Sequence, residues 1–256
     1  MTLLEAVILG IIQGMTEFLP ISSSGHLVLA QHFMDINESG VLLEVILHMG
    51  TLAAILIYYW DELTNLVKDL INSVTEARTY VSYIAVATVP TALTGVFFEN
   101  HIESVFVSSV VIWMLMITGL VVGSTYFFNN CSNREFTYTI VLCIGFFQAF
   151  ALLPGISRSG ITISLAILMG IEHRKAAKFS FFMAIPALIG AGLLKLIKID
   201  NVEQITLFPL ILGFFSAAVV GYLVIDWLLA VISKGKFYLF SLYCFTFAII
   251  AYILIN

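Results

Sequence analysis

Six stretches of this chain are long and apolar enough to cross a lipid bilayer. A transmembrane helix needs about 20 mostly apolar residues, and three of the six stretches contain no Asp, Glu, Lys or Arg. Charged residues make up 11% of the sequence and hydrophobic residues 61%, whereas soluble domains are about 25% charged. The sequence therefore predicts an all-α polytopic membrane protein, with spans at 41–60, 80–98, 105–128, 178–197, 207–231 and 237–255.

Two further apolar segments are interrupted before they reach spanning length. Residues 3–19 run into Pro20 and a Ser-Ser-Ser-Gly sequence, and residues 137–153 run into Pro154; each then resumes for a second short stretch. Irregular backbone at membrane depth is tolerated only where protein or a water-filled cavity surrounds it. We therefore expect two re-entrant helical hairpins. The first segment lacks the basic start of a signal peptide, so we expect it to be retained.

The two interruptions are related in sequence. Residues 13–25 read Gln-Gly-Met-Thr-Glu-Phe-Leu-Pro-Ile-Ser-Ser-Ser-Gly, and residues 148–160 read Gln-Ala-Phe-Ala-Leu-Leu-Pro-Gly-Ile-Ser-Arg-Ser-Gly. A repeated break in corresponding halves of a membrane protein points to a binding site near the bilayer midplane. We expect one membrane domain over 1–256, built from a first repeat of about 1–130 and a second of about 131–256.

The distribution of Lys and Arg predicts the orientation. If each hairpin returns to the side from which it enters, eight of the eleven basic residues lie on one face, which the positive-inside rule makes cytoplasmic. Both termini are then external, and each repeat, a hairpin plus three spans, is inverted relative to the other. The net charge of −5 is spread over both faces and indicates no nucleic-acid partner. The eight residues are Lys68, Arg78, Arg134, Arg174, Lys175, Lys178, Lys234 and Lys236; Lys195 and Lys198 lie on the opposite face.

The first interruption carries ionisable side chains. Gln13 and Glu17 are four residues apart and share a helix face. The serines at 22–24 begin the second half of the hairpin, with His26 one turn further on. Serine is a common helix cap, but capping does not explain a carboxylate and an imidazole, each of which costs about 2.5–3.5 kcal/mol within a membrane segment. We expect Glu17 and His26 to belong to a functional site.

The second interruption carries the features that bind an anion. Gly155 frees the backbone, and residues 157–162 open the next half-helix with hydroxyl groups and Arg158. Free N–H groups at a helix start and a guanidinium fork both suit phosphate oxygens. Arg158 could also serve as a counter-ion to Glu17, and the two roles do not exclude each other.

A second pair of ionisable residues lies within a predicted span. Glu44 and His48 are one turn apart on 41–60 and share a face. Two interpretations remain open at this level. The two side chains either line the cavity of the site or pair with each other.

Residues 13–26 and 154–162 resemble the two signature motifs of the bacterial undecaprenyl-pyrophosphate phosphatases, also known as bacitracin-resistance proteins. The resemblance extends over the whole chain. It implies a bacterial plasma-membrane enzyme that removes one phosphate from undecaprenyl pyrophosphate, recycles the lipid carrier for cell-wall synthesis and confers bacitracin resistance. Its active site is expected to open to the external side. The first motif of the family begins with Glu or Gln, and Gln13 is the less acidic variant.

The resemblance also implies roles for individual residues. Ser23 is expected to attack the terminal phosphorus with His26 as general base and later acid, although His26 as the nucleophile is left open. A divalent cation, Mg²⁺ or Ca²⁺, is expected on Glu17 and the substrate oxygens. The expected catalytic residues are Glu17, Ser23, His26 and Arg158, and the expected substrate-binding residues are Gln13, Ser22, Ser24, Gly25, Gly155, Ser157, Ser159, Gly160 and Thr162.

The expected partners are a polyprenyl diphosphate lipid, the bilayer and a second copy of the chain in a homodimer. The alternative function is a carrier that flips a polyprenyl phosphate or another anionic lipid, because opposed broken helices in inverted repeats are typical of alternating-access transporters. A carrier needs anion donors but no nucleophile. The cluster of Glu17, Ser23 and His26 therefore favours the enzyme.

Overall fold

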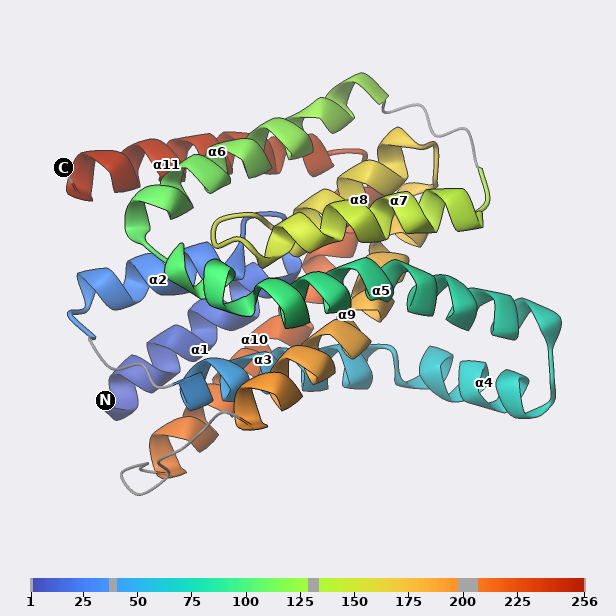
Figure 1. Cartoon of the computed structure of the whole chain (residues 1–256), viewed down its shortest axis with the longest axis horizontal. Coiled ribbons are helices and arrows are strands. Elements are labelled where there is room, and N and C mark those ends of the chain that lie inside the picture. The colour runs from blue at the N-terminus through green and yellow to red at the C-terminus, as the bar shows by residue number, and fades with distance from the viewer. Residues whose placement is uncertain (1, 37–40, 129–133, 198–206, 256) are drawn as a thin grey trace.

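The computed structural model describes residues 2–36, 41–128, 134–197 and 207–255, and it is built from helices (Figure 1). Lys198, which entered the charge count above, lies outside the described residues. The helices are α1 (Leu3–Phe18), α2 (Ser23–Phe33), α3 (Val41–Tyr58), α4 (Trp60–Ile71), α5 (Thr75–Ser104), α6 (Ser108–Ser124), α7 (Tyr138–Gln148), α8 (Arg158–Leu168), α9 (His173–Ile197), α10 (Leu207–Ser233) and α11 (Phe240–Ile255), with 3₁₀ turns η1 (Thr125–Phe128), η2 (Ala149–Leu152) and η3 (Phe237–Leu239).

The described helices account for the six predicted spans. Five of them are long and apolar enough to cross a membrane, namely α5, α6, α9, α10 and α11. The bent pair of α3 and α4 makes a sixth if it is counted as one span. The prediction of an all-α multi-pass membrane protein is confirmed. Helices α5 and α9 begin five residues before the expected starts at 80 and 178.

Helix α4 was not predicted, because apart from its first residue it lies between the predicted spans at 41–60 and 80–98. The chain bends by 74° between α3 and α4, and α4 buries none of its residues. Asp61 and Glu62 lie in its first turn and Lys68 in its last, while Trp60 and Ile71 are exposed apolar residues. A short helix with charged and apolar faces is suited to the interface between water and lipid. Because α4 contains several charged residues, its sequence does not have the pattern of an apolar span.

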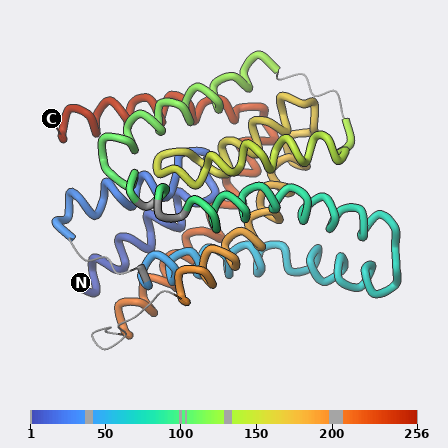
Figure 2. Tube along the Cα trace, viewed as in Figure 1, coloured from blue at the N-terminus to red at the C-terminus, as the bar shows by residue number. Residues whose placement is uncertain are grey.

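Two helical hairpins approach each other from opposite ends of the molecule. Helix α1 runs inward from the end that holds both termini, and α2 returns to that end; α7 and η2 run inward from the other end, and α8 returns (Figures 1 and 2). The two turns are in contact, since the Ser159 hydroxyl donates to the Leu19 carbonyl at 2.9 Å. Both interruptions therefore lie in the middle of the molecule.

Close helix packing holds α1 in place. Helix α10 packs along α1, and a Cβ atom added at Gly14 would lie 2.7 Å from the Ala217 carbonyl oxygen. Small residues that permit such close backbone approach are the usual way in which membrane helices associate. The next turn of α1 is anchored by Phe18, which is fully buried and packs edge-on against Phe181 of α9. Helix α1 is thus fixed by two transmembrane helices.

Polar contacts join the loops at the end opposite the termini. The Arg134 amide donates to the Gly170 carbonyl at 3.1 Å, and Lys175 pairs with Glu135 at 2.7 Å. Lys178 reaches Glu62 at 3.5 Å. Arg134 and two basic residues from the start of α9, Lys175 and Lys178, therefore lie at this end of the bundle.

Candidate active site

Helix α1 presents Gln13 and Glu17 to the interior. It starts with a capping box at Thr2 and Glu5, and its four-residue spacing places the two inner side chains one above the other. Gln13 is fully buried and Glu17 is 7% exposed. The Gln13 amide nitrogen donates to Glu17 Oε2 at 3.1 Å. A carboxylate is thus held at the inner end of a half-helix.

The first turn brings Ser23 back onto this carboxylate. Ser22 has a φ of 68°, and its hydroxyl caps α2 by accepting from the Gly25 amide at 3.2 Å. Ser23 is the first residue of α2, and its hydroxyl donates to Glu17 Oε2 at 2.6 Å. A hydrogen bond from a hydroxyl to a carboxylate is short and strong because the acceptor is charged. Ser23 Oγ is therefore paired with a proton acceptor.

The second turn is fixed by a threonine of α6. Gly155 has a φ of 97°, which glycine adopts readily. The Thr118 hydroxyl donates to the Gly155 carbonyl at 2.9 Å and accepts from the Ser157 amide at 3.0 Å. The Ser157 hydroxyl in turn caps α8 by accepting from the Gly160 amide at 3.0 Å. These contacts set the start of α8 and the direction of Arg158.

Arg158 connects three helices through its guanidinium group. Nη2 donates to Glu17 Oε1 at 2.7 Å, and Nη1 donates to the Ser180 carbonyl of α9 at 3.1 Å. Its side chain is 15% exposed and that of Glu17 is 6% exposed. The counter-ion role considered from the sequence is thus present. Each residue neutralises the charge of the other.

His26 is held in an aromatic pocket beside the site. Its Nδ1 lies 2.8 Å from the Ser22 carbonyl, and its Nε2 lies 2.8 Å from the Tyr243 hydroxyl. The ring stacks on Phe247 with centroids 4.2 Å apart. Both ring nitrogens therefore face partners other than Ser23.

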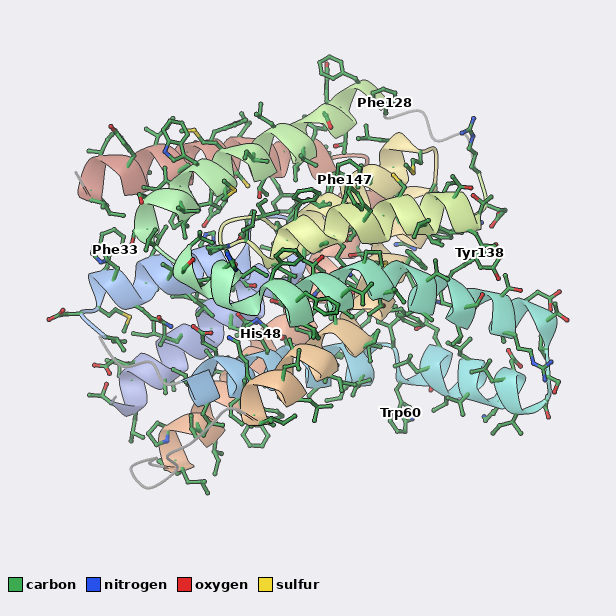
Figure 3. The ribbon with its side chains drawn as sticks, in the orientation of Figure 1. Phe33, His48, Trp60, Phe128, Tyr138 and Phe147 are labelled. Carbon is green, nitrogen blue, oxygen red and sulfur yellow. The ribbon has the colours of Figure 1, made fainter. Side chains whose placement is uncertain are left out.

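His48 approaches the site from α3. Its Nε2 lies 3.8 Å from Glu17 Oε2, and its Nδ1 lies 2.7 Å from the Glu44 carbonyl. The Glu44 carboxylate instead pairs with Lys195 at 2.9 Å. Of the two interpretations of Glu44 and His48, the structure favours the one in which His48 lines the site, in the middle of the molecule (Figure 3).

The remaining residues of the two motifs gather at the same place. Ser24 lies with its hydroxyl 3.3 Å from that of Ser22, and Thr162 lies with its hydroxyl 2.6 Å from that of Ser180. A Cβ atom on Gly25 would lie 3.1 Å from the Gly155 Cα atom. The two motifs thus meet where Gly25 and Gly155 approach each other.

Comparison with known proteins identifies the family. The sequence model described as "Bacitracin resistance protein BacA" matches residues 6–250. The chain belongs to the BacA family. Similar proteins include the undecaprenyl-diphosphatases of Halothermothrix orenii, 39% identical over 99% of this chain and 98% of the relative, and of Caldicellulosiruptor bescii, 39% identical over 97% and 96%. The undecaprenyl-diphosphatase of Methanobrevibacter smithii is 34% identical over 98% and 97%.

Three contact residues of this BacA-family site were missed by the sequence analysis. Thr118, Ser180 and Tyr243 hold Gly155, Arg158 and His26 respectively. Each lies within a predicted span. For Thr118 and Tyr243 an isolated hydroxyl in an apolar helix was the available signal, although many such groups simply bond back to their own helix. Ser180 contacts Arg158 through its backbone carbonyl, for which the residue type gives no signal.

The donor set of the site fits a divalent cation bound mainly through a substrate. Among the described residues, no group of three His, Cys, Asp or Glu side chains converges on one point. Glu17 is the carboxylate of the site, and Gln13 Oε1 beside it is buried without a hydrogen-bond partner. Mg²⁺ typically takes one or two carboxylates and completes its shell with water and phosphate oxygens.

Proposed function

We propose that this BacA-family protein is an undecaprenyl-diphosphatase. It hydrolyses undecaprenyl pyrophosphate to undecaprenyl phosphate and inorganic phosphate, recycles the lipid carrier for cell-wall synthesis and confers bacitracin resistance. The family match and the names of the relatives support this activity. The single observation in the site that carries it is the contact of the Ser23 hydroxyl with Glu17, whose other oxygen pairs with Arg158.

The proposed reaction proceeds in two steps. Ser23 Oγ attacks the terminal phosphorus, its proton passes to Glu17 Oε2, and the bond between phosphorus and the bridging oxygen breaks. Glu17 gives this proton to the departing undecaprenyl phosphate. Water then attacks the phosphoserine, Glu17 accepts a proton from the water, and this proton returns to Ser23 Oγ as phosphate leaves.

Arg158 is proposed to bind the diphosphate. Phosphoryl transfer depends chiefly on positioning and on neutralisation of charge, and a guanidinium fork matches phosphate oxygens in pairs. The amide groups at the starts of α2 and α8 add donors on either side. The Ser180 carbonyl, which accepts from Arg158 Nη1 at 3.1 Å, keeps the guanidinium aimed at Glu17 and Ser23.

Ser23 is favoured over His26 as the nucleophile. Its oxygen lies 2.6 Å from Glu17, which can take its proton. The Nδ1 of His26 faces a carbonyl, which only accepts, so Nδ1 carries a proton; Nε2 faces the Tyr243 hydroxyl. His26 is proposed to hold the first turn in shape, because its contacts run to Ser22 and to α11.

We propose that a divalent cation binds beside Glu17 together with the substrate. Bound there, the ion supplies positive charge that offsets the negative charge of the diphosphate. Glu17 and the buried amide oxygen of Gln13 are the groups that support this assignment.

The two halves are proposed to be inverted repeats in the plasma membrane, with the site open to the external side. The approach of the hairpins from opposite ends supports the inversion (Figure 2). The gathering of Lys175, Lys178 and Arg134 at the end away from the termini supports a cytoplasmic assignment for that end. A homodimer is also proposed, and light scattering of the purified protein measures it.

Phosphate release from a polyprenyl diphosphate by the purified protein tests the function. We expect release in detergent without a partner protein, its loss with a chelator, and its return when a divalent cation is added. Ser23→Ala should abolish it. If the parent releases no phosphate but exchanges polyprenyl phosphate between the leaflets of vesicles, the protein is a carrier and the proposed reaction is wrong.

A further inference from the structure

We propose that His48 supplies a nitrogen ligand to the cation site beside Glu17, so that this chain prefers Zn²⁺ over Mg²⁺ and Ca²⁺. The role of the ion in the reaction rests on the proposed function, whereas the site itself rests on three side chains. These are Glu17 and Gln13 of α1 and His48 of α3.

The hydrogen bonds of His48 leave its inner nitrogen available. A carbonyl oxygen only accepts, so Nδ1, which lies 2.7 Å from the Glu44 carbonyl, carries the proton. In the neutral ring the lone pair is then on Nε2, the atom that lies 3.8 Å from Glu17 Oε2. Histidines that bind metals commonly donate their other N–H to a backbone carbonyl, which fixes the orientation of the ring.

The distance between the two ligand atoms fits a shared ion. Nitrogen and oxygen ligands lie about 2.0–2.2 Å from Zn²⁺, so two ligands of a tetrahedral ion are about 3.3–3.6 Å apart. The 3.8 Å between His48 Nε2 and Glu17 Oε2 exceeds this spacing by a few tenths of an ångström. The two atoms, His48 Nε2 and Glu17 Oε2, therefore need only a small shift to bind one ion.

A buried oxygen with no partner supplies the third ligand. Gln13 is fully buried, and its Oε1 has no hydrogen-bond partner among the described residues. Its amide nitrogen contacts Glu17 Oε2. A flip of the Gln13 amide group places Oε1 at this position in place of the nitrogen. A buried acceptor without a partner costs free energy, and coordination of a cation removes that cost.

The ligand types determine the metal preference. Carboxylate and carbonyl oxygens alone suit Mg²⁺, Ca²⁺ and Mn²⁺, whereas imidazole suits Zn²⁺ and the ions of copper, iron and nickel. Arg158 already neutralises Glu17 in the free protein. We therefore expect the ion to bind more tightly when a diphosphate is present to offset the charge of Arg158.

Electron spin-echo spectroscopy of bound Mn²⁺ tests the inference without any assay of activity. The probe is Mn²⁺ with methylenediphosphonate, added to the purified full-length protein. We expect modulation from a directly bound ¹⁴N nucleus in the parent, which changes to the ¹⁵N pattern when histidine is labelled with ¹⁵N. His48→Gln should remove the modulation, and His32→Gln, an exposed histidine of α2, should retain it.

Metal competition provides a second measurement. His48→Gln should lower the preference for Zn²⁺ over Mg²⁺ by at least about tenfold, because even a group that only orients a ligand contributes 10- to 100-fold to affinity. Absence of a histidine signal in the parent, or a signal that persists in His48→Gln, overturns the inference. The ¹⁵N labelling shows without any variant whether a histidine binds the ion, and His48→Asn is the second variant that assigns the signal if His48→Gln does not fold.

Failure of the inference is distinguishable from failure of the proposed function. Phosphate release by a parent protein that shows only oxygen ligands leaves the function intact and removes His48 from the site. A histidine-bound Mn²⁺ in a protein that does not hydrolyse polyprenyl diphosphate supports the metal site and excludes the proposed function.

Discussion

Glu17 accepts three hydrogen bonds in the interior of a membrane protein, from Gln13, Ser23 and Arg158. A buried charge is stable only when its partners satisfy it, and removal of one member of a buried ion pair costs about 3–5 kcal/mol. Variants at this residue and at Arg158 therefore affect both the reaction and the fold. Each needs a measurement of stability beside the measurement of rate.

Glu17→Gln should lower kcat/KM for polyprenyl diphosphate by at least about 10²-fold, since it removes the proposed proton acceptor of Ser23. Phosphate release by detergent-purified protein measures the effect. Glu5→Gln, on the same helix, is the matched control, because Gln also completes a capping box. Near-parental rates for Glu17→Gln would exclude Glu17 from proton transfer.

Arg158→Lys should remain clearly impaired, because a single ammonium group replaces a planar fork that now reaches both Glu17 and Ser180. We expect kcat to fall and KM to rise, both measured with the same lipid substrate. Arg78→Lys, at an exposed arginine that bonds Ser73, is the control. Parental kinetics for Arg158→Lys would show that Arg158 acts only as a counter-ion to Glu17.

Tyr243→Phe should lower the free energy of unfolding by about 1–3 kcal/mol, since it leaves the buried Nε2 of His26 without its partner. The midpoint of thermal unfolding in detergent reports this loss. We expect a smaller effect on rate than that of Glu17→Gln. An effect on rate as large as that of Glu17→Gln, at unchanged stability, would return His26 to the chemical step.

At this scale the sequence predicted those members of the site that lie next to the two interruptions. The contacts of Ser23 and Arg158 with Glu17 follow from two motifs that meet. The approach of His48 and Tyr243 depends on how distant spans pack, and no local pattern encodes it. The chemical roles of all these residues remain predictions.

At the scale of elements, apolar length predicted the spans and the interruptions predicted the hairpins. Apolar length did not predict α4, because a charged helix at the interface is stabilised by its surroundings rather than by its apolar content. The contact of α1 with α10 likewise depends on how closely the two backbones approach each other and not on apolar content. A Cβ atom added at Gly10 would lie 2.5 Å from the Gly213 carbonyl oxygen and one added at Gly14 would lie 2.7 Å from the Ala217 carbonyl oxygen, so the two helices leave no room for a side chain at either position.

Gly14→Ala should destabilise the protein by about 1–3 kcal/mol, because the added Cβ atom would lie 2.7 Å from the Ala217 carbonyl oxygen. Thermal unfolding in detergent measures it. Gly190→Ala is the control within a membrane helix, since nothing lies within 4 Å of the added atom there. Equal stability of the two variants would contradict the close contact of α1 and α10.

At the scale of the whole molecule, the orientation across the membrane is the main prediction still to be measured. Single cysteines at Ser104 and Asn72, in a background that lacks Cys131, Cys143 and Cys244, mark the two ends; Cys131 lies outside the described residues. A membrane-impermeant thiol reagent on intact cells should label Ser104→Cys and spare Asn72→Cys. The reverse pattern would place the site on the cytoplasmic side.

The contact of Leu19 with Ser159 joins the first eighth of the chain to a segment made much later. During synthesis, Glu17 enters the membrane long before Arg158 emerges from the ribosome. Until α8 inserts, the nascent chain carries a carboxylate in the bilayer without its counter-ion. Insertion of the second hairpin therefore completes the site and gives the carboxylate of the first half its counter-ion, so we expect a protein truncated before α8 to be inactive and less stable.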